Sequence, residues 1–495
     1  MRQQIMSKRL TIRWLLSGLI AASLSFAVAC DGEKARTPES AGSSGLTHEQ
    51  RIAKAYREDN NGWIYLHLEG APEVIGYQHG YLAAAEIVDV RDAVAMSLEH
   101  DTKKNWEFFR TESLRLFWEK TPEEYQKELD GIVSGVNAKL GANRIDRADV
   151  VALNAMEETA FYYVPWLESK KNPKAAENKA PGNCSAFAAT GSWTRDGKIV
   201  MAHNAWISYV IGERWNLIVD LVPEKGHRIF MDAMPGFIHS GDDFYVSSGG
   251  LMVTETTITQ FQGFDPEGIA EFVRARKAIQ YANSIDDWVA IMREGNNGGY
   301  ANDWLVGDNK TGEIARLELG LKNVLLERTA DGYFVGSNFP VNPKLIKEET
   351  TFNPENKGSS ANARRARWEE LMKENKGKID IETAKLFEAD HVDAFLKTED
   401  GNANSLCGHV EIDPRGIPEW EWGPFFPGGT VQAKAVDGTL ASELEFWASM
   451  GHPCGQPFVA KDFLKAHPEY AWQEKFLRDM PGQPWTLFKK GTRPM

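Results

Sequence analysis

The sequence predicts an α+β fold in which β-sheets are covered by layers of helices. Short segments with the two-residue alternation of strands are interleaved with pairs of segments that have helical periodicity. The chain has 495 residues, 42% of them hydrophobic, and 16 tryptophans, which favours a large aromatic core. We find no internal repeat, so we expect residues 46–495 to form one integrated unit.

The net charge and the motifs argue against several classes of function. With a net charge of −14 the chain lacks the basic face that nucleic acid requires. The 11 histidines form no HExxH motif, and the cysteines form no paired CxxC motif. There is also no GxSxG elbow and no phosphate-binding glycine loop. We therefore expect no metal and no cofactor, and we do not favour a serine lipase or a nucleotide-binding protein.

The first 30 residues have the organisation of an export signal. Four basic residues precede an apolar run from residue 14 to 29, which is too short for an ordinary membrane-spanning helix. The run ends in AVAC, which resembles a bacterial lipoprotein signal whose cysteine, here Cys30, is lipidated after cleavage. Residues 31–45 are rich in Gly, Ser and Pro and suit a flexible tether. We expect an exported lipoprotein, periplasmic or at the cell surface and anchored in a membrane; plain secretion is the alternative.

Residues 46–183 predict a largely helical N-terminal segment. A short helix and a strand occupy residues 48–68, a glycine-marked turn opens a helix over 76–96, and amphipathic helix follows over 105–140 with a break near Pro122. Residues 168–183 contain lysine and proline without periodicity, which predicts an exposed loop. Such a loop is either an ordinary surface connection or a second processing site.

The bond between Asn183 and Cys184 is the centre of the predicted function. We interpret it as a self-cleaving junction, because cleavage would leave Cys184 as a chain terminus with both a thiol and a free amine that can act as its base. The run of small residues after it, SAFAATGSW, is typical of a buried strand that a substrate can approach.

A hairpin is expected to return the chain to this position. The Asp-Gly pair at 196–197 predicts a two-residue turn that pairs Arg195 with Lys198. In that register Tyr209 lies opposite Cys184, and the segment HNAWISY is brought beside the predicted nucleophile.

The remaining chain predicts further strands, helices and hairpins. We expect strands within 214–223, 227–236 and 242–258, helices over 266–282, 284–294 and 361–397, hairpins that turn at 310–312 and 331–332, and a mostly irregular tail from residue 407.

The chain has four cysteines. With Cys30 assigned to lipid and Cys184 to catalysis, Cys407 and Cys454 remain. In an exported protein they either form a disulfide or are two separate buried thiols, because the sequence does not give their distance.

Several blocks resemble the phospholipase B-like proteins, which belong to the N-terminal-nucleophile hydrolases. They are NCSAFAATGSW with GKIVMAHNAWISY, then DDFYVSSGGLMVTETTI and NNGGYANDWLV, in this order. The resemblance runs from about Trp63 to the C-terminus, and its more distant relatives are the isopenicillin-N acyltransferases and the bile-salt and penicillin-V amidases.

The resemblance implies a four-layered αββα sandwich that is activated by cleavage before Cys184. The segments 46–183 and 184–495 would then be two associated chains of one precursor. The Cys184 thiolate would attack an ester or amide carbonyl, with the new α-amino group as base. Proton transfer between them is easy near neutral pH, because the usual pKa of an α-amino group is about 7.7–8.0 and that of a thiol about 8.5.

The resemblance also assigns the other catalytic positions. Asn338 in VGSNFPVNP matches an asparagine that stabilises the oxyanion in the relatives. A second such asparagine falls on Ser247 or its neighbour Ser248. The relatives' aspartate aligns with Trp206, which leaves no carboxylate to orient the amine, and an arginine-type position aligns with His203.

Substrate contacts are expected from residues near these positions. Asn204 and Tyr209 follow His203 in the returning strand, and Ser247 is a further candidate. Asn302 and Trp304 in YANDWLV either line the acyl pocket or serve the strand itself.

The sequence thus predicts a self-cleaving cysteine hydrolase acting on esters or amides of acyl lipids. Three alternatives stay open. The first is an amidase or acyltransferase that acts on small N-acyl amides or peptides. The second is papain-like proteolysis by Cys184 and His409 without self-cleavage. The third is a surface lipoprotein that only binds lipid or a partner.

Overall fold

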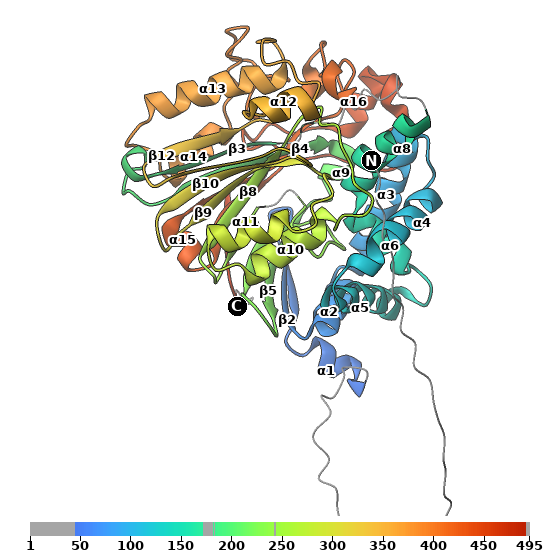
Figure 1. The fold of residues 1–495 in the computed structure, drawn as a ribbon. Coiled ribbons are helices and arrows are strands. Elements are labelled where there is room, and N and C mark those ends of the chain that lie inside the picture. Colours follow the sequence, from blue (N-terminus) through green and yellow to red (C-terminus); the bar gives the residue numbers. More distant parts are fainter. Residues whose placement is uncertain (1–44, 172–181, 183, 242–243, 492–495) are drawn as a thin grey trace, which may run out of the picture. The chain divides into compact units, whose positions relative to one another are not determined.

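Two stacked β-sheets with helices on both outer faces form the body of the protein (Figure 1). The computed structural model describes residues 45–171, 182, 184–241 and 244–491. Residues 46–495 form one compact unit, and residues 1–45 are a separate unit. The predicted αββα sandwich is confirmed by this layer order.

The larger sheet has nine strands and is antiparallel except for one parallel pair, β2 with β5. In spatial order its strands are β1 (Tyr56–Asn60), β2 (Trp63–Gly70), β5 (Leu217–Pro223), β6 (Ile229–Ala233), β7 (Tyr245–Ser247), β8 (Leu251–Thr257), β9 (Asn302–Asp308), β10 (Glu313–Leu319) and β11 (Val324–Thr329). The two strands that precede Cys184 are therefore built into a sheet whose other strands follow it.

The smaller sheet has six antiparallel strands. In spatial order they are β12 (Gly332–Gly336), β3 (Ser185–Thr190), β4 (Val200–Ser208), β13 (Gly428–Asp437), β14 (Glu445–Met450) and β15 (Thr486–Lys489). The alternation in β3 sends Ala186 and Ala188 into the core between the sheets, and Phe187 and Ala189 into the outer core. Alanines on the inner face permit a close approach of the two sheets.

Helices cover each sheet with apolar side chains. Trp368 of α13 and Phe387 of α14 pack on Phe187 of β3, at ring separations of 5.4 and 5.8 Å. On the larger sheet, Trp288 of α11 packs on Trp304 of β9. In chain order, the described α-helices are α1 (His48–Ile52), α2 (Pro72–Leu82), α3 (Ala84–Thr102), α4 (Trp106–Phe117), α5 (Glu123–Leu140), α6 (Arg147–Asn154), α7 (Met156–Glu158), α8 (Val164–Lys171), α9 (Tyr209–Gly212), α10 (Glu271–Tyr281), α11 (Ile285–Arg293), α12 (Pro343–Glu349), α13 (Ser360–Glu374), α14 (Ile381–Glu388), α15 (Gly438–Ser442) and α16 (Ala460–Ala466). None of these described helices has an apolar span long enough to cross a membrane.

Glycines hold α2 and α5 in close contact. The predicted glycine-marked turn at 76–80 is wrong, because α2 starts at Pro72 and contains both Gly76 and Gly80. A Cβ on Gly80 would lie 2.1 Å from the backbone oxygen of Ile132, and one on Gly135 would lie 2.3 Å from that of Tyr77. The glycines therefore serve backbone-to-backbone packing. The predicted break before α5 is confirmed at 118–122.

The hairpin after Cys184 has a different register from the prediction. β3 ends at Thr190, and the following segment pairs instead with the chain before α14, where the backbone nitrogen of Arg195 donates to the backbone oxygen of Ile379 at 2.9 Å. The observed register places Ala186 opposite His203. The Asp-Gly pair at 196–197 thus lies in a longer connection, and Tyr209 does not lie opposite Cys184.

Two other expectations differ from the structure. The hairpin at 310–312 is confirmed, but the one at 331–332 is wrong, because β11 and β12 belong to different sheets. Asp331 accepts from the backbone nitrogen and hydroxyl of Ser192, both at 2.7 Å, which directs β12 to β3. The described part of the tail from 407 is mostly irregular, as predicted, but the prediction misses β13, a central strand between β4 and β14.

Gly80→Ala tests the packing of α2 on α5. Alanine favours a helix by about 1 kcal/mol over glycine, but the clash with Ile132 forces the helices apart. We expect a net loss of about 1–3 kcal/mol in the free energy of unfolding, measured by denaturant titration. Ser134→Ala, on the exposed side of α5, is the control and should change stability little. A Gly80→Ala protein as stable as wild type would contradict this account.

Candidate active site

Cys184 lies directly before β3, where the two sheets meet. Its side chain is 1% exposed, and its φ of +108° is in the left-handed region that non-glycine residues seldom adopt. Its Sγ donates to Oε1 of Glu255 on β8, over 3.7 Å. Together with a ring nitrogen of His203 on β4, these atoms lie within 4.8 Å of one another. The sheets thus bring together a thiol, an imidazole and a carboxylate.

Glu255 is a candidate active-site residue that the sequence did not indicate. It is fully buried in β8, and Tyr300 donates its hydroxyl to Oε1 at 3.2 Å. With its amide nitrogen turned toward Glu255, Asn302 donates to Oε2 at 2.9 Å. The expectation that no carboxylate reaches the site is therefore wrong, because the larger sheet supplies one. A single acidic residue in the otherwise uncharged strand LMVTETT is the signal that could have identified it.

Arg364 on α13 is a second candidate that the sequence did not indicate. It is fully buried, and its guanidinium donates to the backbone oxygen of Cys184 at 2.6 Å, to Oγ of Ser185 at 2.8 Å and to Oδ1 of Asn338 at 2.8 Å. The guanidinium lies 4.3 Å from the ring centre of Trp206. Burial lowers the pKa of Arg364 to about 9, and the neighbouring Cys184 opposes this shift. Arg364 thus connects α13 to the start of β3, to Asn338 and to Trp206 of β4.

Asn338 is linked to Cys184 through Arg364, which donates to the Cys184 carbonyl and to Oδ1 of Asn338. Its φ is +72°, its Nδ2 donates to the backbone oxygen of Thr257 at 2.8 Å, and its Oδ1 is held by Arg364. A Cβ on Gly182 would lie 2.6 Å from the side chains of both Asn338 and Trp420. The uncut chain therefore passes directly over the predicted oxyanion donor.

A small pocket lies next to Cys184. Its volume is about 10 Å³, which is close to the lower limit for a single water molecule. It is lined by Glu157, Cys184, Ala205, Trp206, Ile207, Trp215 and Tyr300. Burial raises the pKa of Glu157 to about 7. The wall is apolar and aromatic except for this carboxyl and the Tyr300 hydroxyl.

Two predicted substrate contacts have structural roles instead. Asn204 faces α14 and donates to the backbone oxygens of Glu388 at 2.8 Å and Leu406 at 3.0 Å. Tyr209 donates its hydroxyl to Glu411 at 2.6 Å. The first prediction is wrong because alternation along β4 sends His203 inward and Asn204 outward, and the second because the hairpin register is shifted.

The other predicted contacts divide between the site and the core. Ser247, at the end of β7, is level with Leu251 of β8, which lies four residues or about 13 Å along that strand from Glu255. The prediction that Ser247 contacts the substrate is therefore wrong. Trp304 packs on Trp288 at a ring separation of 5.2 Å, which favours its role in the strand. Asn302 faces Glu255.

Cys407 and Cys454 are free thiols that come together around His409. Both sulfurs lie 3.5 Å from Nε2 of His409, and Nδ1 of the same ring lies 3.0 Å from Oε1 of Glu411. Because both ring nitrogens are engaged there, the papain-like pairing of His409 with Cys184 is wrong.

Three groups of described side chains have the composition and spacing to hold a metal ion. One is the site group of Cys184, His203 and Glu255, a second surrounds Cys407 and Cys454, and a third shares His409 with the second and adds Glu411 and His452. Asn183 and Cys30 lie outside the described residues, so the cleavage junction and the lipidation remain predictions.

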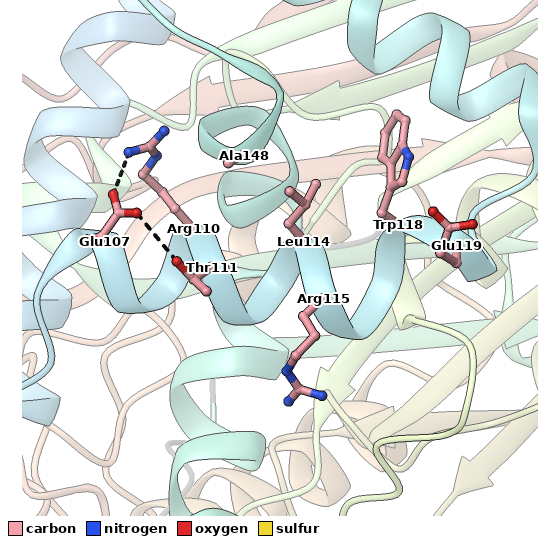
Figure 2. Close-up of a pocket in the computed structure, with 8 residues that line it drawn as sticks. All are labelled: Glu107, Arg110, Thr111, Leu114, Arg115, Trp118, Glu119 and Ala148. Carbon is pink, nitrogen blue, oxygen red and sulfur yellow. Dashed lines mark hydrogen bonds and ion pairs between the residues drawn. The ribbon is translucent and has the colours of Figure 1, made fainter.

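A separate hollow of about 470 Å³ lies on the outer side of α4 (Figure 2). Arg110 pairs with Glu107 at 2.5 Å, and Thr111 donates to the same carboxylate at 3.4 Å. Figure 2 shows Arg110 and Arg115 leaving the helix in different directions. Arg110 and Arg115 each pair with a glutamate three residues earlier on the same helix, which is typical of a solvated surface.

The raised pKa of Glu157 predicts a loss of stability with increasing pH. The folded protein favours the protonated carboxyl, so the folded state binds more protons than the unfolded state between about pH 4.5 and about 7. Stability from this group is present at low pH and is lost as the pH rises through that range. The free energy of unfolding is measured by denaturant titration at about pH 5 and about pH 8. Its difference between the two pH values should be smaller in Glu157→Gln than in the wild-type protein. The exposed Glu119→Gln is the control, and an equal effect of both would contradict the assignment.

Comparisons with known proteins agree with the resemblance in the sequence. A family model described as Phospholipase B matches residues 74–484. An uncharacterized protein of Archaeoglobus fulgidus is 26% identical over 301 residues, which cover 58% of this chain and 48% of that protein. Phospholipase B-like 1 of Homo sapiens is 27% identical over 268 residues, which cover 48% of this chain and 47% of that protein.

The extent of these matches is limited. The chain spans about half the length of these curated relatives. A crystal structure of a variant of conjugated bile acid hydrolase from Clostridium perfringens matches 54% of this chain and 89% of that chain, with 12% identity and a TM-score of 0.30, too low to support an argument. The family model covers most of residues 46–495, including every described residue of the site. The chain belongs to the phospholipase B family.

Proposed function

We propose that this protein is a self-activating hydrolase in which Cys184 is the nucleophile for esters or amides of acyl substrates. The observation that carries the proposal is the buried Cys184 thiol, which donates to Glu255 at 3.7 Å. The left-handed backbone of Cys184 supports it further, because strained backbone of this kind is concentrated at functional sites.

In the proposed activation, the Cys184 thiol gives its proton to Glu255, and Sγ attacks the carbonyl carbon of Asn183. The C–N bond breaks, a thioester forms, and the proton passes to the nitrogen, which becomes the free amine of Cys184. Water then hydrolyses the thioester and releases the carboxylate of Asn183. Glu255 is held for this role by Tyr300 and Asn302.

In the proposed turnover, the amine of Cys184 takes the thiol proton, and the thiolate attacks the acyl carbonyl. The alcohol or amine of the substrate leaves with that proton, and water hydrolyses the acyl-enzyme. The Asn338 amide is the oxyanion donor that we infer, since Arg364 links it to Cys184 and orients it. Glu255 then orients the new ammonium group.

We propose an acyl lipid as substrate, through deacylation of the phospholipase B type. The apolar and aromatic lining of the Cys184 pocket supports an acyl chain over a charged group. The pocket of about 10 Å³ in the uncut chain is too small for such a chain, so substrate entry would follow processing. Small N-acyl amides are the alternative substrate, and a lipoprotein that only binds lipid is the alternative without catalysis.

We propose that the two chains stay associated after cleavage. β2 is hydrogen-bonded within the larger sheet to β5 along Ile64–Gly70, and α2 to α6 contribute to the main hydrophobic core. Separation would expose a sheet edge and this core to water. We also propose that Cys30 carries a lipid, which would hold the enzyme at the membrane where acyl lipids occur.

Cys184→Ala is the direct test. Intact mass spectrometry and N-terminal sequencing of the exported wild-type protein should reveal a chain starting at Cys184, and Cys184→Ala should stay uncut. Hydrolysis should fall by about 1,000-fold or more, because the nucleophile is lost. Ser247→Ala, at the end of β7 and away from Glu255, should be processed and active. A Cys184→Ala protein that is cleaved and active like wild type would refute the proposal.

The substrate class is tested on the processed protein. Release of fatty acid from phosphatidylcholine vesicles is compared with hydrolysis of N-acyl amino acids, and a higher kcat/KM for the phospholipid is expected. A preference for the N-acyl amino acids would favour the amidase alternative.

Glu255→Gln tests the proton acceptor. Glutamine has the same shape but cannot take the thiol proton, so self-cleavage should slow by about 100-fold or more. The rate is followed by gel electrophoresis of freshly translated protein. An unchanged rate in a variant with normal circular dichroism would exclude Glu255 from this role.

A further inference from the structure

Four metal-binding side chains converge at a second place in the fold, behind the wall of the active site. His391, Cys407, His409 and Cys454 each offer one ligand atom, and all four atoms lie within 4.8 Å of one another. They come from three separate segments: the chain after α14, the loop that contains Cys407 and His409, and the turn after β14. We call these four residues the Cys/His cluster.

The distances in the Cys/His cluster fit tetrahedral coordination. The Sγ atoms of Cys407 and Cys454 both lie 3.5 Å from Nε2 of His409. In a tetrahedral zinc site, with Zn–S of about 2.3 Å and Zn–N of about 2.0–2.1 Å, neighbouring ligand atoms are separated by about 3.3–3.8 Å. The buried Nε2 of His391 has no oxygen or nitrogen partner among the described residues.

Neighbouring groups orient the cluster in the way metal sites require. Nδ1 of His409 lies 3.0 Å from the carboxylate of Glu411, which leaves Nε2 to face the two sulfurs. The backbone nitrogen of Gln456 donates to Sγ of Cys454 at 3.5 Å. His452 is already engaged through both ring nitrogens, with the Tyr209 hydroxyl and the backbone oxygen of Gln456, both at 2.9 Å.

We propose that the Cys/His cluster is a structural zinc site. Two thiols and two imidazoles are the ligands that zinc prefers, whereas calcium and magnesium take oxygen ligands. Four protein ligands complete the tetrahedral shell and leave no position for a substrate, so the ion stabilises the fold and does not take part in catalysis.

The position of the cluster gives the ion a definite effect. Gly408, between two ligands, lies against Trp206, since a Cβ there would be 2.1 Å from the indole ring. Arg364 contacts the same indole ring, since its guanidinium lies 4.3 Å from the ring centre, and it also donates to the Cys184 carbonyl. The zinc ion would fix the loop that supports the wall of the Cys184 site. This proposal does not depend on the proposed hydrolase activity.

A disulfide between Cys407 and Cys454 is the competing state. Both thiols are free in the structure, and both contact the same nitrogen of His409. A disulfide would remove the two thiolates and leave His391 and His409 without a metal. The two states therefore differ in zinc content and in the number of titratable thiols.

The test is elemental analysis of the full-length protein purified without chelator, together with thiol titration in denaturant. We expect about one zinc ion per chain, and release of this zinc with thiol-modifying reagents. His391→Ala and Cys454→Ser should lose the zinc and unfold at a lower Tm. Cys184→Ala removes a thiol outside the Cys/His cluster, so this variant should keep the zinc ion.

Cobalt(II) gives a second measurement that does not depend on the stability of variants. Wild-type protein stripped of metal and reloaded with cobalt(II) should gain the absorption bands of tetrahedral thiolate coordination, and Cys184→Ala should gain them equally. A protein that binds neither zinc nor cobalt, or a peptide map with Cys407 joined to Cys454, would overturn the proposal.

Discussion

The site depends on the hydrogen bonds of the buried Arg364 guanidinium. A charged group in the protein interior is costly unless its donors are satisfied, and here they bind the Cys184 carbonyl, Ser185 and Asn338. The Trp206 ring covers one face. These contacts join α13 to the start of β3 and to the chain after β12. They hold Cys184 and Asn338, both in left-handed backbone conformations, in positions that an isolated peptide would not keep.

The close stacking of the two sheets makes this arrangement possible. Alanines on the inner face of β3 let β4 and β8 approach, so that His203 from one sheet and Glu255 from the other reach the same thiol. The N-terminal segment supports the larger sheet through the parallel pair of β2 and β5, and its helices contribute to the main hydrophobic core. The site therefore requires the whole unit and not one local motif.

The wall of the site is also supported from behind. Trp206 contacts both Arg364 and Gly408, and the Gly408 loop contains two members of the Cys/His cluster. Whatever fixes that loop also fixes the indole ring. Changes at the cluster should thus reach Cys184 through packing, without any contact between the two groups.

The sequence by itself determined the layered α+β fold and the family, and it pointed to Cys184 and Asn338 as candidates, because strand alternation and local motifs are written in consecutive residues. It did not determine the register of the hairpin after Cys184, since the Asp-Gly signal describes a local turn and pairing with Ile379 overrides it. Only the tertiary structure brought Glu255, Arg364 and the Cys/His cluster into place. Their members are far apart in sequence, and the stacking of sheets and helices decides which distant side chains meet.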